Sequence, residues 1–235
     1  MAFYTESIRD RRLRGAARET MASVEKNLHW VILGAAVLAG GLGFWASHRW
    51  LQAPSAEPVA MQSALLYPQP KVIADFQLRD PAGQAFTLER WRGHWNLVFF
   101  GFTNCPDVCP TSLAVARDAR KLLQAEAPDI DLKVSFISVD PERDEPKLLA
   151  DYVRFFDADF LAATGTVEAL TALTAPLGVI FAKVPTGDGP FDYTIDHTAS
   201  LLIVDPEGRL KGLIRPPHDA ARIAADLKLL AKDSR

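Results

Sequence analysis

The sequence predicts an α/β domain built on a mixed sheet with helices on both faces, preceded by one N-terminal transmembrane helix. Three observations predict this fold class. Strand-like and helix-like apolar patterns alternate along the second half of the chain, two late strand patterns are joined by a short turn, and one long apolar stretch lies near the start. Alternation favours a parallel arrangement of strands, and the late pair of strands adds an antiparallel part.

The apolar stretch covers residues 28–47, LHWVILGAAVLAGGLGFWAS, and has no Asp, Glu, Lys or Arg. A helix of this length is about 30 Å long, which matches the hydrocarbon core of a bilayer. Trp30 and Trp45 lie near its two ends, where aromatic side chains anchor helices at the membrane interface. The stretch therefore predicts a single transmembrane anchor.

Basic residues are concentrated before this stretch: Arg11, Arg12, Arg14, Arg18 and Lys26 precede it, whereas Arg49 follows it closely. The positive-inside rule therefore places residues 1–27 in the cytoplasm and the rest of the chain across the membrane. A cleaved signal peptide is the alternative, but the polar lead and the length of the apolar stretch favour an uncleaved anchor. Acidic residues in the lead disfavour a mitochondrial transit peptide. We expect a single-pass protein of the bacterial inner membrane with a periplasmic domain.

The segment that follows the anchor, residues 48–70, contains four prolines among small and polar residues. Such a composition predicts a semi-extended tether. The soluble domain is then expected to cover residues 71–235.

The elements of this domain can be placed in order from the period of their apolar residues. A hairpin is expected to turn at residues 80–83, DPAG, and the turn at 205–208, DPEG, joins the last two strands. Strands are predicted at 95–101, 132–139, 179–184, 199–204 and 210–214, and helices at 113–124, 146–156, 166–173 and 219–231. The charged residues Asp140, Glu142, Arg143 and Asp144 predict a solvated turn after the second of these strands.

Charge and cysteine content exclude several classes of protein. The net charge of −3, with no basic run interleaved with aromatic residues in the second half of the chain, argues against nucleic-acid binding. The chain has two cysteines, four positions apart, which excludes a disulfide-dense scaffold and a four-cysteine zinc site. A pair this close predicts a redox site or a metal site, and the alternative is a disulfide that staples a short loop.

Both cysteines lie in the motif GFTNCPDVCP, residues 101–110, between a predicted central strand and the following helix. This is the carboxyl end of the sheet, where open α/β folds place their chemistry, and the thioredoxin-like fold satisfies the arrangement. A helix that opens at Cys109 would favour the thiolate of that residue. Two thiolates, from Cys105 and Cys109, are soft ligands that select Cu(I) and, less distinctively, zinc.

A third ligand is expected among the five histidines. His197 lies in the connection that leads into the strand at 199–204. In a thioredoxin-like topology this connection lies beside the cysteine loop. We expect ordinary structural roles for the other four, which are His29, His48, His94 and His218.

Five segments together resemble, in order and spacing, the SCO/SenC family: GFTNCPDVCP, VDPERDEP, GTVEAL, YTIDHTA and IVDPEG. The resemblance covers residues 71–235. It implies copper binding through Cys105, Cys109 and His197, and a role in assembling the copper centre of a haem–copper respiratory oxidase, as a metallochaperone or as a thiol reductant. The implied partners are the oxidase subunit that carries the copper centre, another copper chaperone and a periplasmic thiol reductant.

Asp107 and Asp196 also match acidic positions of that family pattern. The sequence leaves three roles open for these two residues, which are tuning of the site, docking of a partner and simple solvation. Neither residue is predicted to be a metal ligand.

The alternative function is that of an enzyme, a periplasmic thiol–disulfide oxidoreductase or a peroxidase. A peroxidase is disfavoured, because neither cysteine has Thr or Ser three positions before it or Pro seven positions before it, as a peroxiredoxin would. Disulfide reduction stays open, because the same two sulfurs can carry two electrons. His197 separates the two functions, since a dithiol exchanger does not need it and a three-coordinate copper site does.

Overall fold

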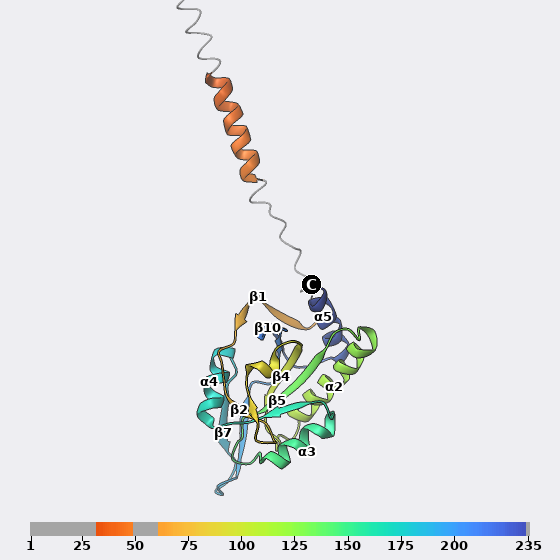
Figure 1. Ribbon diagram of the computed structural model, residues 1–235. Helices are drawn as coiled ribbons and strands as arrows, with labels where there is room; N and C mark the ends of the chain where they lie inside the picture. The colour runs from red at the N-terminus through yellow and green to blue at the C-terminus, as the bar shows by residue number, and fades with distance from the viewer. Residues whose placement is uncertain (1–31, 49–60, 234–235) are drawn as a thin grey trace, which may run out of the picture. The chain divides into compact units, whose positions relative to one another are not determined.

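The computed structural model describes residues 32–48 and 61–233. The chain divides into two units, Met1–Pro58 and Val59–Arg235. In the first unit, a helix covers residues 32–48 (Figure 1). Among the described residues, no helix is long and apolar enough to cross a membrane. The predicted anchor at 28–47 begins outside the described residues.

The second unit is built on a six-stranded sheet with the strand order β1-β10-β9-β4-β5-β6 (Figure 1). The strands are β1 (Ala64–Val72), β10 (Arg209–Ile214), β9 (Leu201–Val204), β4 (Trp95–Gly101), β5 (Leu132–Ser138) and β6 (Leu161–Ala163). β4, β5 and β6 are parallel, whereas β9 runs antiparallel to β4 and β10 antiparallel to β9. The predicted mixed sheet is confirmed.

Two hairpins lie outside this sheet. β2 (Leu78–Arg79) pairs with β3 (Ala85–Phe86), as the turn at 80–83 predicts. β7 (Phe181–Pro185) pairs with β8 (Tyr193–His197), and this second hairpin carries His197 at the end of its second strand. The sequence predicted a connection at 193–197, so β8 is an element that its pattern did not reveal.

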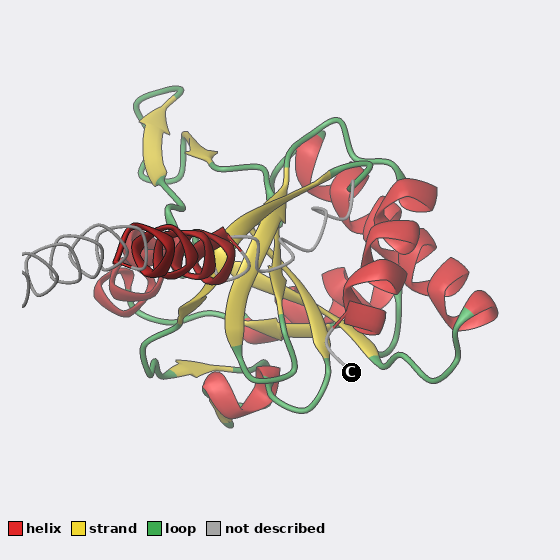
Figure 2. Ribbon diagram, turned by 90° about the horizontal axis from the view of Figure 1, so that it is seen from above, coloured by secondary structure: helices red, strands yellow, loops and turns green. Residues whose placement is uncertain are grey.

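Helices cover both faces of the sheet, as predicted (Figures 1 and 2). The helices are α2 (Val108–Glu126), α3 (Pro146–Phe156), α4 (Val167–Leu177) and α5 (Ala220–Asp233), with a 3₁₀ turn η1 at Leu88–Trp91. α2 packs against α3 and α5 on one face. α4 lies on the opposite face, with the β2–β3 hairpin and η1.

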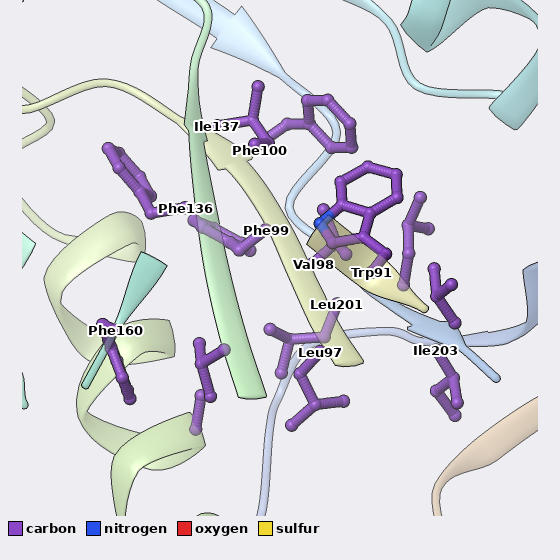
Figure 3. Packing of buried hydrophobic residues seen from close by; sticks show 14 of the residues in the cluster. Trp91, Leu97, Val98, Phe99, Phe100, Phe136, Ile137, Phe160, Leu201 and Ile203 are labelled. Carbon is purple, nitrogen blue, oxygen red and sulfur yellow. The ribbon is translucent and has the colours of Figure 1, made fainter. Parts of the chain in front are cut away.

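The central strands β4 and β5 are buried on both sides, and their side chains alternate between the two layers (Figure 3). Phe99 stacks on Phe136 with ring centroids 6.4 Å apart, on the side of α3. On the other side, the indole N–H of Trp91 donates a hydrogen bond of 3.1 Å to the hydroxyl of Ser135. The cysteine loop therefore leaves a strand that is fixed from both faces.

The folded unit begins earlier than the boundary predicted at residue 71, because β1 occupies residues 64–72. Pro68 and Pro70 suggested a tether, yet an edge strand tolerates proline, and the pairing of β1 shifts register between Leu66 and Lys71. The buried carboxylate of Asp226 in α5 also holds this segment. This carboxylate accepts hydrogen bonds from the backbone N–H groups of Gln62, Ser63 and Ala64 and from the hydroxyl of Ser63.

Candidate metal centre

The cysteine loop leaves β4 at Gly101 and enters α2 at Val108. Gly101 leaves room for a sulfur: a Cβ atom here would lie 2.7 Å from Cys109 Sγ and 2.9 Å from a ring carbon of Phe136. Cys109 is fully buried against this point and Cys105 is 8% exposed. Both cysteines therefore lie at the carboxyl end of the parallel strands, as the sequence predicted.

His197 reaches the same place from the end of β8. Its ring lies edge-on to Phe99 and Phe102, with centroids 5.8 and 5.9 Å away. Nδ1 lies 3.2 Å from the carbonyl oxygen of Thr198, and Nε2 lies 3.4 Å from Cys109 Sγ. If Nδ1 carries the proton and its N–H donates a hydrogen bond to the carbonyl oxygen, the Nε2 lone pair faces the sulfur, which is the tautomer that a metal ligand requires.

The three donor atoms of Cys105, Cys109 and His197 all lie within 4.8 Å of one another. Metal–sulfur and metal–nitrogen bonds of about 2.0–2.3 Å place the donors of a three-coordinate site roughly 3.5–4 Å apart. The donor set therefore fits one soft or borderline metal ion with little rearrangement.

The two thiols differ strongly in acidity. The pKa of Cys105 is lowered to about 4, mainly by a hydrogen bond from the Cys109 side chain. Burial opposes this shift, whereas hydrogen bonds from His197 and from backbone N–H groups add to it. The hydrogen bond between the two cysteine side chains, together with burial, raises the pKa of Cys109. The sequence favoured a thiolate at Cys109 through the helix terminus. In the structure, the backbone N–H of Cys109 points to the Cys105 sulfur at 3.4 Å, so the positive end of α2 acts on Cys105 instead.

The turn after β5 fixes the cysteine loop through the carboxylate of Asp144, which is 1% exposed. This carboxylate accepts hydrogen bonds from the backbone N–H and the hydroxyl of Thr103, at 3.0 and 2.6 Å, and from the hydroxyl of Ser138 at 2.6 Å. Thr103 lies two residues before Cys105. The turn thereby sets the start of the loop that carries both cysteines.

The same turn holds the strand that carries His197. Asp140 is fully buried, accepts a hydrogen bond of 2.7 Å from the hydroxyl of Tyr193, and pairs with the Arg143 guanidinium. Arg143 in turn donates to the carbonyl oxygen of Tyr193 at 2.7 Å and stacks 3.7 Å from the centroid of its ring. The prediction of a solvated turn is therefore wrong for Asp140 and Asp144. Their long-range partners, Tyr193 and Thr103, cannot be recognised from the local pattern.

The structure separates the two acidic residues of the family pattern from the donor cluster. Asp107 is the exposed residue before α2, where its carboxylate accepts a weak hydrogen bond from Thr111. Asp196 is exposed, and its side chain points to the opposite face of β8 from that of His197. Neither belongs to the cluster of three donors found among the described residues.

Of the other histidines, His94 and His218 belong to the same folded unit as the three donors. His218 contacts the Ser112 hydroxyl and the carbonyl oxygen of Ile214, and burial lowers its pKa. Neither His94 nor His218 belongs to the cluster of three donors, and His48 lies in the first unit. The expectation for His29 concerns a residue outside the described range.

Comparison with known proteins identifies the family. The SCO1/SenC family model matches residues 66–232. The chain belongs to the SCO1/SenC family. A relative from Stutzerimonas stutzeri, whose name refers to copper binding, is 39% identical over 155 residues, which cover 66% of this chain and 74% of the relative.

Solved structures of SCO1/SenC proteins share the fold. Bradyrhizobium japonicum ScoI, solved with copper bound, is 37% identical with a TM-score of 0.59, over 67% of this chain and 98% of that one. Arabidopsis thaliana ScoI, also solved with copper bound, is 28% identical with a TM-score of 0.63, over 68% of this chain and 99% of that one. The thioredoxin-like α/β fold expected from the sequence is confirmed for this family member.

The unequal acidity of the thiols predicts how the reduced protein reacts with iodoacetamide. We expect Cys105 to be alkylated first, at a rate that is already constant between pH 6 and 8, because its pKa is about 4. An unperturbed thiol would instead react about tenfold faster for each pH unit up to roughly 8.5. Mass spectrometry of peptides measures the order. A rate that climbs steadily from pH 6 to 8, or a Cys105→Ser variant that keeps the fast reaction, would contradict this assignment.

Removal of the partly buried guanidinium of Arg143 should loosen the hairpin that carries His197. We expect Arg143→Ala to destabilise the protein by about 3 kcal/mol, because it leaves the carboxylate of Asp140 buried with one partner fewer. Amide hydrogen exchange in β8 should rise more than exchange in β4. Lys147→Ala is the matched control, since Lys147 pairs with Asp151 at the surface of α3, where a salt bridge contributes little to stability. Equal exchange in β8 of the wild type and Arg143→Ala would refute the role of this contact.

Proposed function

We propose that this SCO1/SenC protein is a copper metallochaperone, which binds one copper ion through Cys105, Cys109 and His197 and serves assembly of the copper centre of a haem–copper respiratory oxidase. The observation that carries the proposal is the convergence of two sulfurs and one imidazole nitrogen within 4.8 Å. Copper-bound structures of two related proteins support copper as the metal. The oxidase subunit that receives the copper is the proposed principal partner.

The donor set suits both oxidation states of copper. Two thiolates satisfy Cu(I), which is soft and accepts low coordination numbers, whereas the imidazole nitrogen adds the donor that Cu(II) prefers. Metal binding requires both thiols to lose their protons. The Cys105 thiolate supplies the first charge, and Nε2 of His197 already lies 3.4 Å from the Cys109 sulfur.

The proposal includes a membrane anchor at residues 28–47 and a periplasmic location for the copper-binding domain. Its support is the sequence: an uncharged apolar stretch follows an arginine-rich lead. An anchored domain searches a small volume near the membrane surface, which raises its effective concentration towards a membrane-bound oxidase.

Disulfide reduction is the second candidate function. The observation in its favour is the pair of adjacent sulfurs, one of them acidic, since a thiolate of low pKa and a neighbouring thiol are the components of thiol–disulfide exchange. In this function the protein would reduce the cysteines of the oxidase subunit or of another target.

His197→Ala separates the two candidates. We expect Cu(II) affinity to fall at least ~100-fold, because a direct ligand should cost no less than the residues that orient ligands. The dithiol potential should change by less than about 30 mV, because exchange needs no third ligand. Copper titration against a competing chelator, equilibration with glutathione, and oxidase activity in a deletion strain measure the three quantities.

The controls for this experiment remove a donor elsewhere or a sulfur from the cluster. His218→Ala removes an imidazole outside the cluster and should bind copper normally, whereas Cys109→Ser should abolish both copper binding and exchange. Full oxidase activity with His197→Ala would defeat copper delivery and favour the reductase.

The orientation of the anchor is tested with reporters fused after Arg235. Alkaline phosphatase, which is active in the periplasm, should be active in this fusion, and a reporter that needs the cytoplasm should be inactive. The physical reason is the excess of arginine before the apolar stretch. Replacement of Arg11, Arg12, Arg14 and Arg18 by glutamine is expected to weaken this preference. Cytoplasmic activity of the intact fusion would refute the proposed location.

A further inference from the structure

Phe102 is the first residue after β4, and its buried ring contacts the imidazole of His197. The two ring centroids lie 5.9 Å apart and the ring planes are at 90° to each other. Phe99, within β4, makes the same kind of contact at 5.8 Å and 84°. Two phenyl rings, one from the sheet and one from the cysteine loop, therefore stand perpendicular to the imidazole.

These two rings supply what the polar contacts of the imidazole leave open. The side-chain torsion that turns a histidine ring about its Cβ–Cγ bond is intrinsically broad, so the neighbouring groups decide where the two nitrogens point. Nδ1 lies 3.2 Å from the carbonyl oxygen of Thr198, but one such contact lets the ring pivot about it. The phenyl rings restrict this rotation. The result is an imidazole whose Nε2 lies 3.4 Å from the Cys109 sulfur.

Of the two rings, that of Phe102 is tied to the supports of the metal centre as well as to the core. The Arg143 guanidinium lies 5.7 Å from the centroid of the Phe102 ring and stacks at 3.7 Å on Tyr193, at the start of β8. Phe102 thus contacts both the ligand at the end of β8 and the cation that holds its start. Its backbone carbonyl accepts a hydrogen bond of 3.3 Å from the N–H of Cys105, which does not involve the side chain.

We propose that Phe102 is a positioning residue of the metal centre, whose ring holds the imidazole of His197 in the direction that places Nε2 beside the Cys109 sulfur. The inference rests on the proposed function for its effect on copper, whereas the orientation of the imidazole can be measured in the metal-free protein. Two sulfurs can hold Cu(I), but Cu(II) prefers nitrogen donors. Phe102 therefore acts mainly on Cu(II) affinity.

Phe102→Leu tests the proposal in the full-length protein in detergent micelles, because it keeps an apolar side chain and removes the ring. We expect Cu(II) affinity to fall at least ~10-fold, as for other residues that orient metal ligands, and Cu(I) affinity to fall much less. Competition with chelators measures both affinities. Phe102→Met, which is closer to phenylalanine in length, is a second variant with the same expectation.

The readout without metal is the NMR spectrum of protein labelled with ¹⁵N at histidine, recorded at about pH 9, where free histidine is neutral. The two ring nitrogens of a neutral imidazole have widely separated chemical shifts when one tautomer dominates. In Phe102→Leu the shifts of the His197 nitrogens should move towards each other, because a ring that can turn samples both tautomers. The rate of alkylation of Cys105 should stay that of the wild type, since the backbone contact of the loop is kept.

Phe86→Leu is the matched control, because Phe86 is also fully buried and contacts another aromatic ring, that of Trp91 in η1, at 6.1 Å. It should lower the midpoint of thermal unfolding as Phe102→Leu does, but keep Cu(II) affinity and the His197 nitrogen shifts. Wild-type nitrogen shifts or wild-type Cu(II) affinity in Phe102→Leu would each overturn this inference alone. A changed rate at Cys105 would also overturn it, because the cysteine loop itself would then have moved. Failure of the wild type to bind copper would overturn the proposed function, and the nitrogen shifts would then decide whether Phe102 orients the imidazole.

Discussion

The turn between β5 and α3 is the constraint on which the geometry of the metal centre depends. Its two buried carboxylates bind two different segments. Asp144 accepts hydrogen bonds from Thr103, at the start of the cysteine loop, and Asp140 accepts one from Tyr193, at the start of β8. The sulfurs and the imidazole come from segments about 90 residues apart in sequence. A single short turn, residues 139–145, holds both segments, which removes most of the freedom that would otherwise separate the donors.

Burial of the carboxylates strengthens the hydrogen bonds of this turn, but it also carries an electrostatic cost. A buried carboxylate near the sulfurs repels negative charge, and the charge of Asp144 contributes to the raised pKa of Cys109. Hydrogen bonds from Thr103 and Ser138 and the guanidinium of Arg143 offset this cost within the turn. A metal cation at the three donors would relieve the remaining repulsion. The protein without metal thus holds a site whose electrostatics favour a positive ion.

The sequence was most informative where local period and burial agree. β4 and α3 have the predicted bounds because a continuous apolar run and a helical apolar face are each visible in a short window. Prediction from the sequence failed for strands whose formation depends on partners far away in the chain. Prolines concealed the edge strand β1, which depends on pairing with β10 and on the carboxylate of Asp226, and β8 depends on β7 and on the Arg143 contact.

The three donor residues of the candidate site could be predicted from the sequence, but the residues that hold them in place could not. The cysteine pair is a local motif, and the position of His197 followed from topology and family resemblance. The charges of residues 140–144 looked like those of an ordinary surface turn, because nothing local distinguishes a solvated aspartate from one that is buried against Tyr193 or Thr103. For the same reason, the helix terminus was assigned to the wrong sulfur: its N–H group points back to Cys105.

The division of the donors between two kinds of support has a physical consequence for metal exchange. Both cysteines lie between a fully buried central strand and the first turn of a long helix, so their positions are tied to the core. His197 is carried by a two-stranded hairpin outside the six-stranded sheet, held by a guanidinium, a tyrosine ring and a few hydrogen bonds at partly exposed positions. Water can replace such polar contacts at lower cost than it can replace core packing. In the proposed function, the imidazole would therefore be the ligand that leaves first, and Cys105 and Cys109 alone would leave a copper ion open to a donor from a partner.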